Sequence, residues 1–266
     1  MMRKAEPMSR FSRVSVAATS AMAALALAAC SSSGGKQTEE GGGSAGGVDT
    51  PEMTVAFITH AEPGDTFWDQ VRAGAEDAAK KNNVKLEYTA NPEGAQQANL
   101  VQQAVDKKVD GIAVTLSKPD AMKSAVDAAR KAGIPVVALN GGLDDWKKMG
   151  VESYFGQDEK IAGEAAGDKL KSGGAKKVLC VIHEQGNVGL EDRCAGVKEK
   201  VPSTQILYVD GKNLPNIVTN VQAKLSQSKN IDWVIGLNAD VTLNALKGRD
   251  GAGSKAKIGT FDTNGD

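Results

Sequence analysis

Hydrogen-bonding side chains of this 266-residue chain lie just after its short apolar runs. Asp65 follows the run 53–60, and two aromatic residues, Phe67 and Trp68, come directly after it. The other candidate residues in comparable positions are Asn140, Asn187, Arg193, Asn238 and Asp262. A carboxylate accepts hydrogen bonds, an amide donates and accepts them, and a guanidinium donates them in a planar fork. Such a set could hold several hydroxyls of one small ligand.

The adjacent aromatic pair is informative because aromatic residues make up only 4% of the chain. A sugar ring has apolar C–H faces that an aromatic side chain can cover. The alternative is that Phe67 and Trp68 belong to the core under the first helix. The side chains of two neighbouring residues at the start of a helix point in different directions. We therefore expect Trp68 to face the ligand and leave the direction of Phe67 open.

Two other candidates also have purely structural interpretations. Arg193 could lie on a solvated helix face. Asn140 could be a turn residue, because Asn140-Gly141-Gly142 suits a tight turn.

Apolar runs alternate with helix-like segments from residue 53 to 140, and the alternation starts again after Phe155. The predicted strands are 53–60, 84–90, 110–116, 134–140, 176–184, 204–210, 232–238 and 257–262. The predicted helices are 67–82, 93–108, 118–132, 158–171, 190–201, 214–228 and 239–247. The runs are nearly continuous in Val, Ile, Leu and Ala, which indicates parallel strands buried on both faces.

This order predicts an α/β fold with two Rossmann-like lobes, each a doubly wound parallel sheet. We assign residues 51–156 to the N-terminal lobe and 157–266 to the C-terminal lobe. Ligands of such folds bind beyond the carboxyl ends of the strands. The predicted site is therefore a cleft between the lobes.

The first 50 residues indicate export and anchoring. A basic start is followed by an apolar stretch that ends in Leu27-Ala28-Ala29-Cys30, which resembles the lipobox of bacterial lipoproteins. Residues 1–29 are then a signal peptide, and Cys30 carries the lipid and begins a flexible Gly/Ser-rich tether over 30–50. The alternative is an ordinary secretory signal with an incidental cysteine. The expected location is extracytoplasmic, anchored to the membrane.

Two cysteines remain once Cys30 is lipidated. Cys180 and Cys194 form an even pair in an oxidising compartment, where a disulfide would stabilise the fold by about 3 kcal/mol. The alternative is two buried free thiols.

Several function classes are disfavoured. The net charge of −1 and the mixed charges argue against nucleic-acid binding. No strand-to-helix turn has the glycine pattern of a dinucleotide site. Cys180 and His183 would point to opposite faces of one strand, which argues against thiol catalysis. His60 and His183 are the only histidines, and neither has the clustered partners of a zinc site. We therefore predict no catalytic residue, cofactor or metal.

The segment DGIAVTLSKPDAMKSAVDAARKAGIPVVALN (110–140), the aromatic pair and the terminal TFDTNGD resemble the periplasmic-binding-protein type I family. The likeness is to its ribose, galactose and inositol branch, which feeds ABC importers, and it covers residues 54–266. It implies two Rossmann-like lobes that close on a monosaccharide by a hinge motion. Aromatic rings would stack on the sugar, with charged and amide side chains around it.

The resemblance assigns the ligand-binding positions of the family to Asp65, Phe67, Trp68, Asn140, Arg193 and Asp262. Asn187 lies in the loop that precedes Arg193 and aligns more loosely. The family commonly has adjacent Asn-Asp where this chain reads Asn238-Ala239-Asp240, which leaves a contact of Asn238 with the ligand open.

Family members continue for several tens of residues past the position of Asp262. The resemblance therefore implies that a chain stopping at Asp266 is truncated, without its last strands and two of three hinge segments. Such a chain is expected to have exposed sheet edges and weak or no binding.

The resemblance implies a monomeric substrate-binding lipoprotein that captures a monosaccharide or polyol. Its partners would be ABC permease subunits and, through the lipid, the membrane. The alternative is a sensory lipoprotein that presents its ligand to a membrane receptor kinase. Both would use the same closed form, so the sequence does not separate them. A sugar-responsive regulator is disfavoured because a lipobox stands where its DNA-binding module would be.

Overall fold

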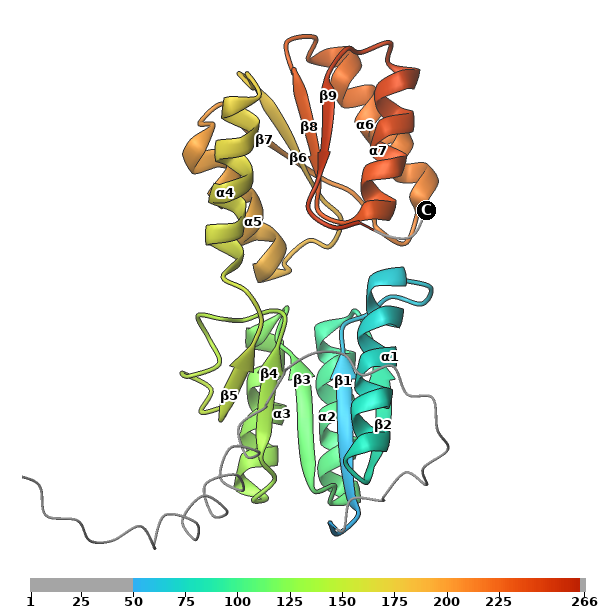
Figure 1. Cartoon of the computed structure of the whole chain (residues 1–266), viewed down its shortest axis with the longest axis vertical. Helices are drawn as coiled ribbons and strands as arrows, with labels where there is room; N and C mark the ends of the chain where they lie inside the picture. Colours follow the sequence, from blue (N-terminus) through green and yellow to red (C-terminus); the bar gives the residue numbers. More distant parts are fainter. Residues whose placement is uncertain (1–49, 264–266) are drawn as a thin grey trace, which may run out of the picture. The chain divides into compact units, whose positions relative to one another are not determined.

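Two parallel β-sheets follow one another along the chain in the computed structural model, which describes residues 50–263 (Figure 1). These residues belong to one compact unit, and none of their helices is long and apolar enough to cross a membrane. The predicted signal peptide, Cys30 and nearly all of the tether lie outside the described residues.

The first sheet has the strand order β2-β1-β3-β4-β5, and every neighbouring pair is parallel. Its strands are β1 (Met53–Thr59), β2 (Val84–Ala90), β3 (Gly111–Thr115), β4 (Val136–Leu139) and β5 (Ser153–Phe155). Its helices are α1 (Thr66–Lys81), α2 (Gly94–Lys107) and α3 (Pro119–Lys131). Strand β5 was not predicted from the sequence, because three residues with mixed polarity form no apolar run.

Helices cover both faces of the first sheet. Val101 of α2 and Met122 of α3 pack with Ile58 and Val114 in one fully buried cluster. Helix α1 lies on the other face of the sheet (Figure 1). On that face the Phe57 ring contacts the Tyr88 ring edge to face, with the ring centroids 5.5 Å apart. Burial on both faces explains why these strands read as continuous apolar runs.

The second sheet has the order β7-β6-β8-β9 and is also parallel throughout. Its strands are β6 (Val178–Ile182), β7 (Gln205–Tyr208), β8 (Trp233–Gly236) and β9 (Lys257–Thr260). Its helices are α4 (Glu159–Ser172), α5 (Val188–Lys200), α6 (Leu214–Gln227) and α7 (Ala239–Gly251). Along β6, Cys180 and Ile182 face α4 and α5, whereas Leu179 and Val181 face α6 and α7. The predicted doubly wound α/β fold is confirmed.

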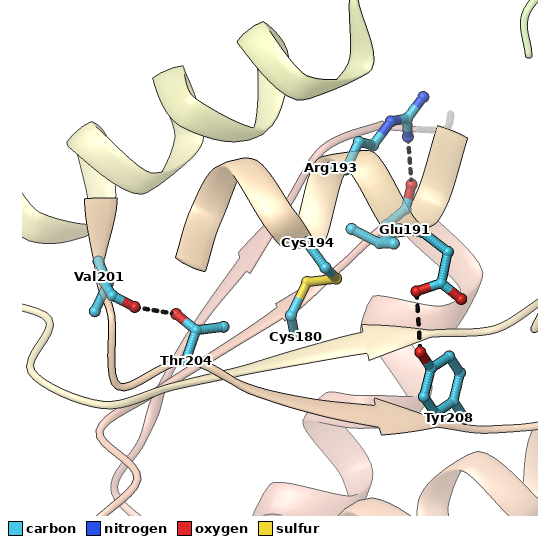
Figure 2. The surroundings of a disulfide bond; sticks show 8 residues. Cys180, Glu191, Arg193, Cys194, Val201, Thr204 and Tyr208 are labelled. Carbon is cyan, nitrogen blue, oxygen red and sulfur yellow. Dashed lines mark hydrogen bonds between the residues drawn. A yellow bond between two sulfur atoms is a disulfide. The ribbon is translucent and has the colours of Figure 1, made fainter. Parts of the chain in front are cut away.

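Disulfide formation between Cys180 and Cys194 ties α5 to β6 (Figure 2). The Cα atoms are 5.9 Å apart, and both residues are fully buried. The bond fixes α5 at the residue that follows Arg193. A second contact holds the same helix, because the Tyr208 hydroxyl of β7 lies 2.9 Å from the Glu191 carboxylate (Figure 2). The predicted disulfide is present, so the alternative of two free thiols is wrong.

Helices α4 and α5 approach closely through two glycines. A Cβ atom on Gly163 of α4 would clash with the backbone carbonyl of Arg193 in α5. A Cβ atom on Gly196 of α5 would clash with the carbonyl of Lys160 in α4. The short distance between these backbones therefore requires glycine at both positions.

We predict that Gly163→Ala lowers the free energy of unfolding by about 1–3 kcal/mol, because the added methyl group overpacks the contact between α4 and α5. Urea denaturation followed by circular dichroism measures the change. Gly74→Ala is the matched control, since Gly74 is exposed in α1 and a methyl group added there would meet no other atom within 4 Å. That substitution is expected to stabilise by up to about 1 kcal/mol. Equal effects at both positions would contradict the close packing.

Candidate functional site

A cavity of about 510 Å³ lies at the carboxyl ends of strands from both sheets. Its walls come from the loops after β1, β4, β6, β7, β8 and β9 and from the N-terminal parts of α1, α4, α5, α6 and α7. In each sheet the chain reverses its winding direction beside the first strand, between β1 and β3 and between β6 and β8. Open α/β sheets bind ligands at such switch points.

One cavity contains all eight side chains that were predicted from the sequence to bind the ligand. They are Asp65, Phe67, Trp68, Asn140, Asn187, Arg193, Asn238 and Asp262. Seven further polar or charged residues also line the cavity, and none of them was predicted as ligand-binding. They are His60, Glu62, Glu159, His183, Glu184, Lys212 and Asp240. Their position directly after a strand could have identified His60 and His183, but nothing in the local sequence distinguishes Glu159.

Three of the selected residues also begin helices. One carboxylate oxygen of Asp65 accepts hydrogen bonds from the backbone N–H groups of Phe67 and Trp68, at 3.0 and 3.3 Å. Asn187 and Asn238 cap α5 and α7 through their side-chain oxygens in the same way. Capping satisfies otherwise unpaired N–H groups of the first helical turn. These side chains are therefore fixed in place, and only their remaining polar atoms are available to a ligand.

Phe67 and Trp68 both line the cavity, with ring centroids 5.2 Å apart in an edge-to-face contact. The expectation that Trp68 faces the ligand site agrees with its place in the cavity lining, and Phe67, whose direction the sequence left open, belongs to the same lining. Trp68 is nearly buried and its ring contacts the His60 ring at 4.9 Å, while Phe67 is partly exposed. The two side chains therefore line the same cavity although they are neighbours at the start of α1.

Arg193 is buried, and the alternative of a solvated helix face is wrong. Its Nε and Nη2 atoms donate to the two carboxylate oxygens of Glu159, and Nη1 donates to the carbonyl of Leu237 at 3.1 Å. The Asp262 carboxylate lies 3.6 Å from Nη1. Burial lowers the pKa of Arg193, but Glu159 and Asp262 outweigh burial and raise the pKa above its ordinary value.

Asn140 takes the left-handed backbone conformation, with φ of 65°. Its backbone carbonyl accepts a hydrogen bond from the Tyr154 hydroxyl at 2.8 Å. Asn140 is therefore both a turn residue and part of the cavity wall, since Asn tolerates the left-handed conformation better than most residues.

A polar network beside the cavity joins residues that follow strands of the two sheets. His60 Nδ1 lies 2.7 Å from the Thr115 hydroxyl, and His60 Nε2 lies 3.3 Å from the Asn187 amide nitrogen. The same amide nitrogen donates to Glu184 at 2.8 Å, and Lys118 pairs with Glu184 at 2.9 Å. The loops of both sheets thus contact each other directly at the site.

Carboxylates outnumber cations among the lining residues. The carboxylates are Glu62, Asp65, Glu159, Glu184, Asp240 and Asp262, and the cations are Arg193 and Lys212. Burial lowers the pKa of His60 and of His183 to about 4, so both imidazoles are neutral near pH 7. Burial raises the pKa of Asp65 and Asp262 above its ordinary value. No group of His, Cys, Asp or Glu within residues 50–263 is arranged to hold a metal ion.

Known proteins resemble this chain in sequence and structure. A carbohydrate transporter from Acidothermus cellulolyticus 11B, solved in complex with myo-inositol, is 50% identical, with a TM-score of 0.79 over 80% of this chain and 75% of that chain. The xylitol-binding protein of Mycolicibacterium smegmatis is 28% identical over 78% of this chain. The ribose import binding protein of Bacillus subtilis is 25% identical over 75% of this chain.

The chain spans 58% of the length of the xylitol-binding protein and 67% of the ribose import binding protein. Residues 55–266 match the family model described as a periplasmic binding protein domain. That match covers most of the chain and coincides with both sheets and the cavity. The chain therefore belongs to the periplasmic binding protein domain family.

Proposed function

We propose that this chain captures a monosaccharide or a related polyol outside the cytoplasm and delivers it to the permease subunits of an ABC importer. The observation that carries the proposal is the composition of the cavity. An apolar wall of Phe67 and Trp68 shares one space with Arg193, Asp262 and Asn140. A sugar or cyclitol has the matching chemistry, with apolar ring faces and hydroxyls that both donate and accept hydrogen bonds.

The size and the likeness to known proteins support the same ligand class. A volume of about 510 Å³ lies within the range of small-molecule sites. The 50% identical structure holds myo-inositol, and two curated relatives are named for xylitol binding and ribose import. Because the name of one relative refers to import, we favour transport over presentation to a receptor kinase.

The proposed mechanism is a shift between open and closed forms of two lobes, residues 51–156 and 157–266. Only the closed form brings the loop with Asp65 and Phe67 and the loops with Arg193 and Asp262 onto one ligand. A ligand that contacts both sets has a higher affinity for the closed form and increases its population. The protein acts as a monomer and needs no catalytic residue or cofactor for this step.

The leader adds a proposed location. A lipid on Cys30 would hold the protein at the membrane, and the tether over residues 30–50 would let the binding domain move above it. At roughly 5–6 Å times the square root of the residue number, such a tether spans about 25 Å.

We predict that isothermal titration calorimetry on the full-length protein detects binding of at least one uncharged compound among myo-inositol, xylitol, D-ribose, D-galactose and D-allose. Arg193→Ala and Asp262→Ala should each weaken that binding by about 1–3 kcal/mol, because ligand hydroxyls lose charged hydrogen-bond partners.

Arg72→Ala is the matched control, since Arg72 is an exposed arginine of α1 that pairs with Glu76 away from the lining residues. Its affinity should equal that of the unsubstituted chain. Unchanged affinity in both the Arg193 and the Asp262 variant would show that the site is assigned wrongly. Failure of every compound on this panel to bind would contradict the proposed ligand class.

We predict that Cys30→Ser releases the protein from the membrane fraction while its ligand affinity stays the same. Without the thiol no lipid can be attached, whereas the cavity lies within other residues. Fractionation with an antibody against the binding domain, followed by calorimetry on both forms, measures the two properties. A variant that still sediments with membranes would rule out lipid anchoring at this residue.

A further inference from the structure

We propose that Glu159 is the positioning residue of Arg193, and that by cancelling the guanidinium charge it restricts the cavity to uncharged hydroxylated ligands. This inference rests on the proposed function and concerns which members of the ligand class the site admits. It would exclude sugar acids and sugar phosphates.

The contact geometry leaves Arg193 little freedom. Glu159 accepts two hydrogen bonds along one edge of the guanidinium, from Nε and from Nη2, the second at 3.1 Å. Nη1 donates to the carbonyl of Leu237 at 3.1 Å. A guanidinium has five N–H bonds in a fixed plane, so one hydrogen on Nη1 and one on Nη2 remain after these three bonds, and the Asp262 carboxylate lies 3.6 Å from Nη1. Those two can bind hydroxyl oxygens of a ligand only while Glu159 holds the plane.

The Glu159 carboxylate is itself held by the protein. Gln157 donates from Nε2 to the same Glu159 oxygen that accepts from Arg193 Nε, at 3.0 Å. Asp158 caps α4 by accepting from the backbone N–H of Ile161, which fixes the first helical turn that contains Glu159. Both partners of the ion pair are buried, at 6% and 7% exposed. A buried pair of this kind is sensitive to the loss of either charge.

Two contacts of α4 and α5 restrict the positions of Glu159 and Arg193. The close approach of α4 and α5 occurs at Gly163, one helical turn after Glu159, against the backbone of Arg193. The disulfide fixes the next residue, Cys194, to β6 (Figure 2). The carboxylate and the guanidinium are thus anchored from both of their helices.

The charge balance argues for the selectivity. Of the described residues that line the cavity, Arg193 and Lys212 are the cations, and each already faces carboxylates. Arg193 contacts Glu159 and Asp262, and Lys212 pairs with Glu62 at 3.1 Å and with Glu93 at 3.3 Å. A ligand carboxylate or phosphate would therefore enter a space with excess negative charge. Uncharged hydroxyls avoid this repulsion and can accept from the remaining N–H bonds.

The test substitutes Glu159→Gln, which keeps the size of the side chain and removes its charge. Glu164→Gln is the matched control, a partly exposed carboxylate of the same helix that pairs with Lys200. The first measurement needs no ligand and follows exchange of the Arg193 Nε–H with water by ¹⁵N NMR, assigned through its loss in Arg193→Lys. We expect exchange to accelerate by about tenfold or more in Glu159→Gln and to stay unchanged in Glu164→Gln.

The second measurement compares D-glucuronate with D-glucuronamide, which have nearly the same shape and differ in charge. In the unsubstituted chain the amide should bind at least about tenfold tighter, and Glu159→Gln should reduce this ratio about tenfold. A merely structural role would weaken both compounds by the same factor. Glu159→Asp restores the charge, so its ratio should return toward that of the unsubstituted chain, even if Glu159→Gln lowers stability.

Each outcome decides one point. Equal exchange rates for Arg193 in Glu159→Gln and the unsubstituted chain would overturn the positioning role. Glucuronate that binds as tightly as glucuronamide in the unsubstituted chain would overturn the charge selectivity. If no uncharged compound binds, the proposed function fails, while the NMR comparison still decides whether Glu159 positions Arg193.

Discussion

The buried ion pair between Glu159 and Arg193 is the interaction on which the site depends. A guanidinium removed from water is costly unless its charge and its N–H groups are satisfied. Glu159 comes from the first turn of α4 and Arg193 from α5, so the pair forms only when the two helices lie close together. Gly163 and Gly196 permit that approach, and the disulfide at Cys194 keeps α5 against β6. Packing that looks purely structural therefore determines where the central donor of the cavity lies.

Helix capping gives the site a second source of rigidity. Asp65, Asn187 and Asn238 each follow a strand and use a side-chain oxygen to cap the next helix. In a parallel sheet every strand ends at the same edge, so the capping residues of successive helices gather there. These three residues begin helices and also line the cavity. A ligand then meets polar atoms whose positions are already set by backbone hydrogen bonds, which reduces the conformational entropy lost on binding.

The sequence allowed the fold and the location of the site to be predicted, because both follow from local patterns. Continuous apolar runs indicated buried parallel strands, and polar residues after them indicated the cavity. The partner of Arg193 could not be predicted in this way, since Glu159 lies 34 residues earlier and the contact exists only through helix packing. The strand β5 was missed because three residues of mixed polarity carry no periodic signal. The sequence left the direction of Phe67 open, because the spacing of two neighbours at a helix start does not determine whether one cavity reaches both side chains, as it does here.

The electrostatics of the cavity favour hydrogen bonding over charge recognition. His60 and His183 could have supplied positive charge, but burial lowers the pKa of both to about 4. Lys212 and Arg193 are charged, yet carboxylates lie against each of them. The polar atoms that remain belong to neutral imidazoles, to amides and to charged groups that have already formed some of their hydrogen bonds. Such atoms can bind hydroxyls that lie at the distance and in the direction of a hydrogen bond. Such a site gains specificity from the number of hydroxyls that fit at once, because each unmatched buried group costs about 1–3 kcal/mol. Under the proposed function, the arrangement of hydroxyls around a ring, and not the overall charge of the ligand, then determines which compound binds.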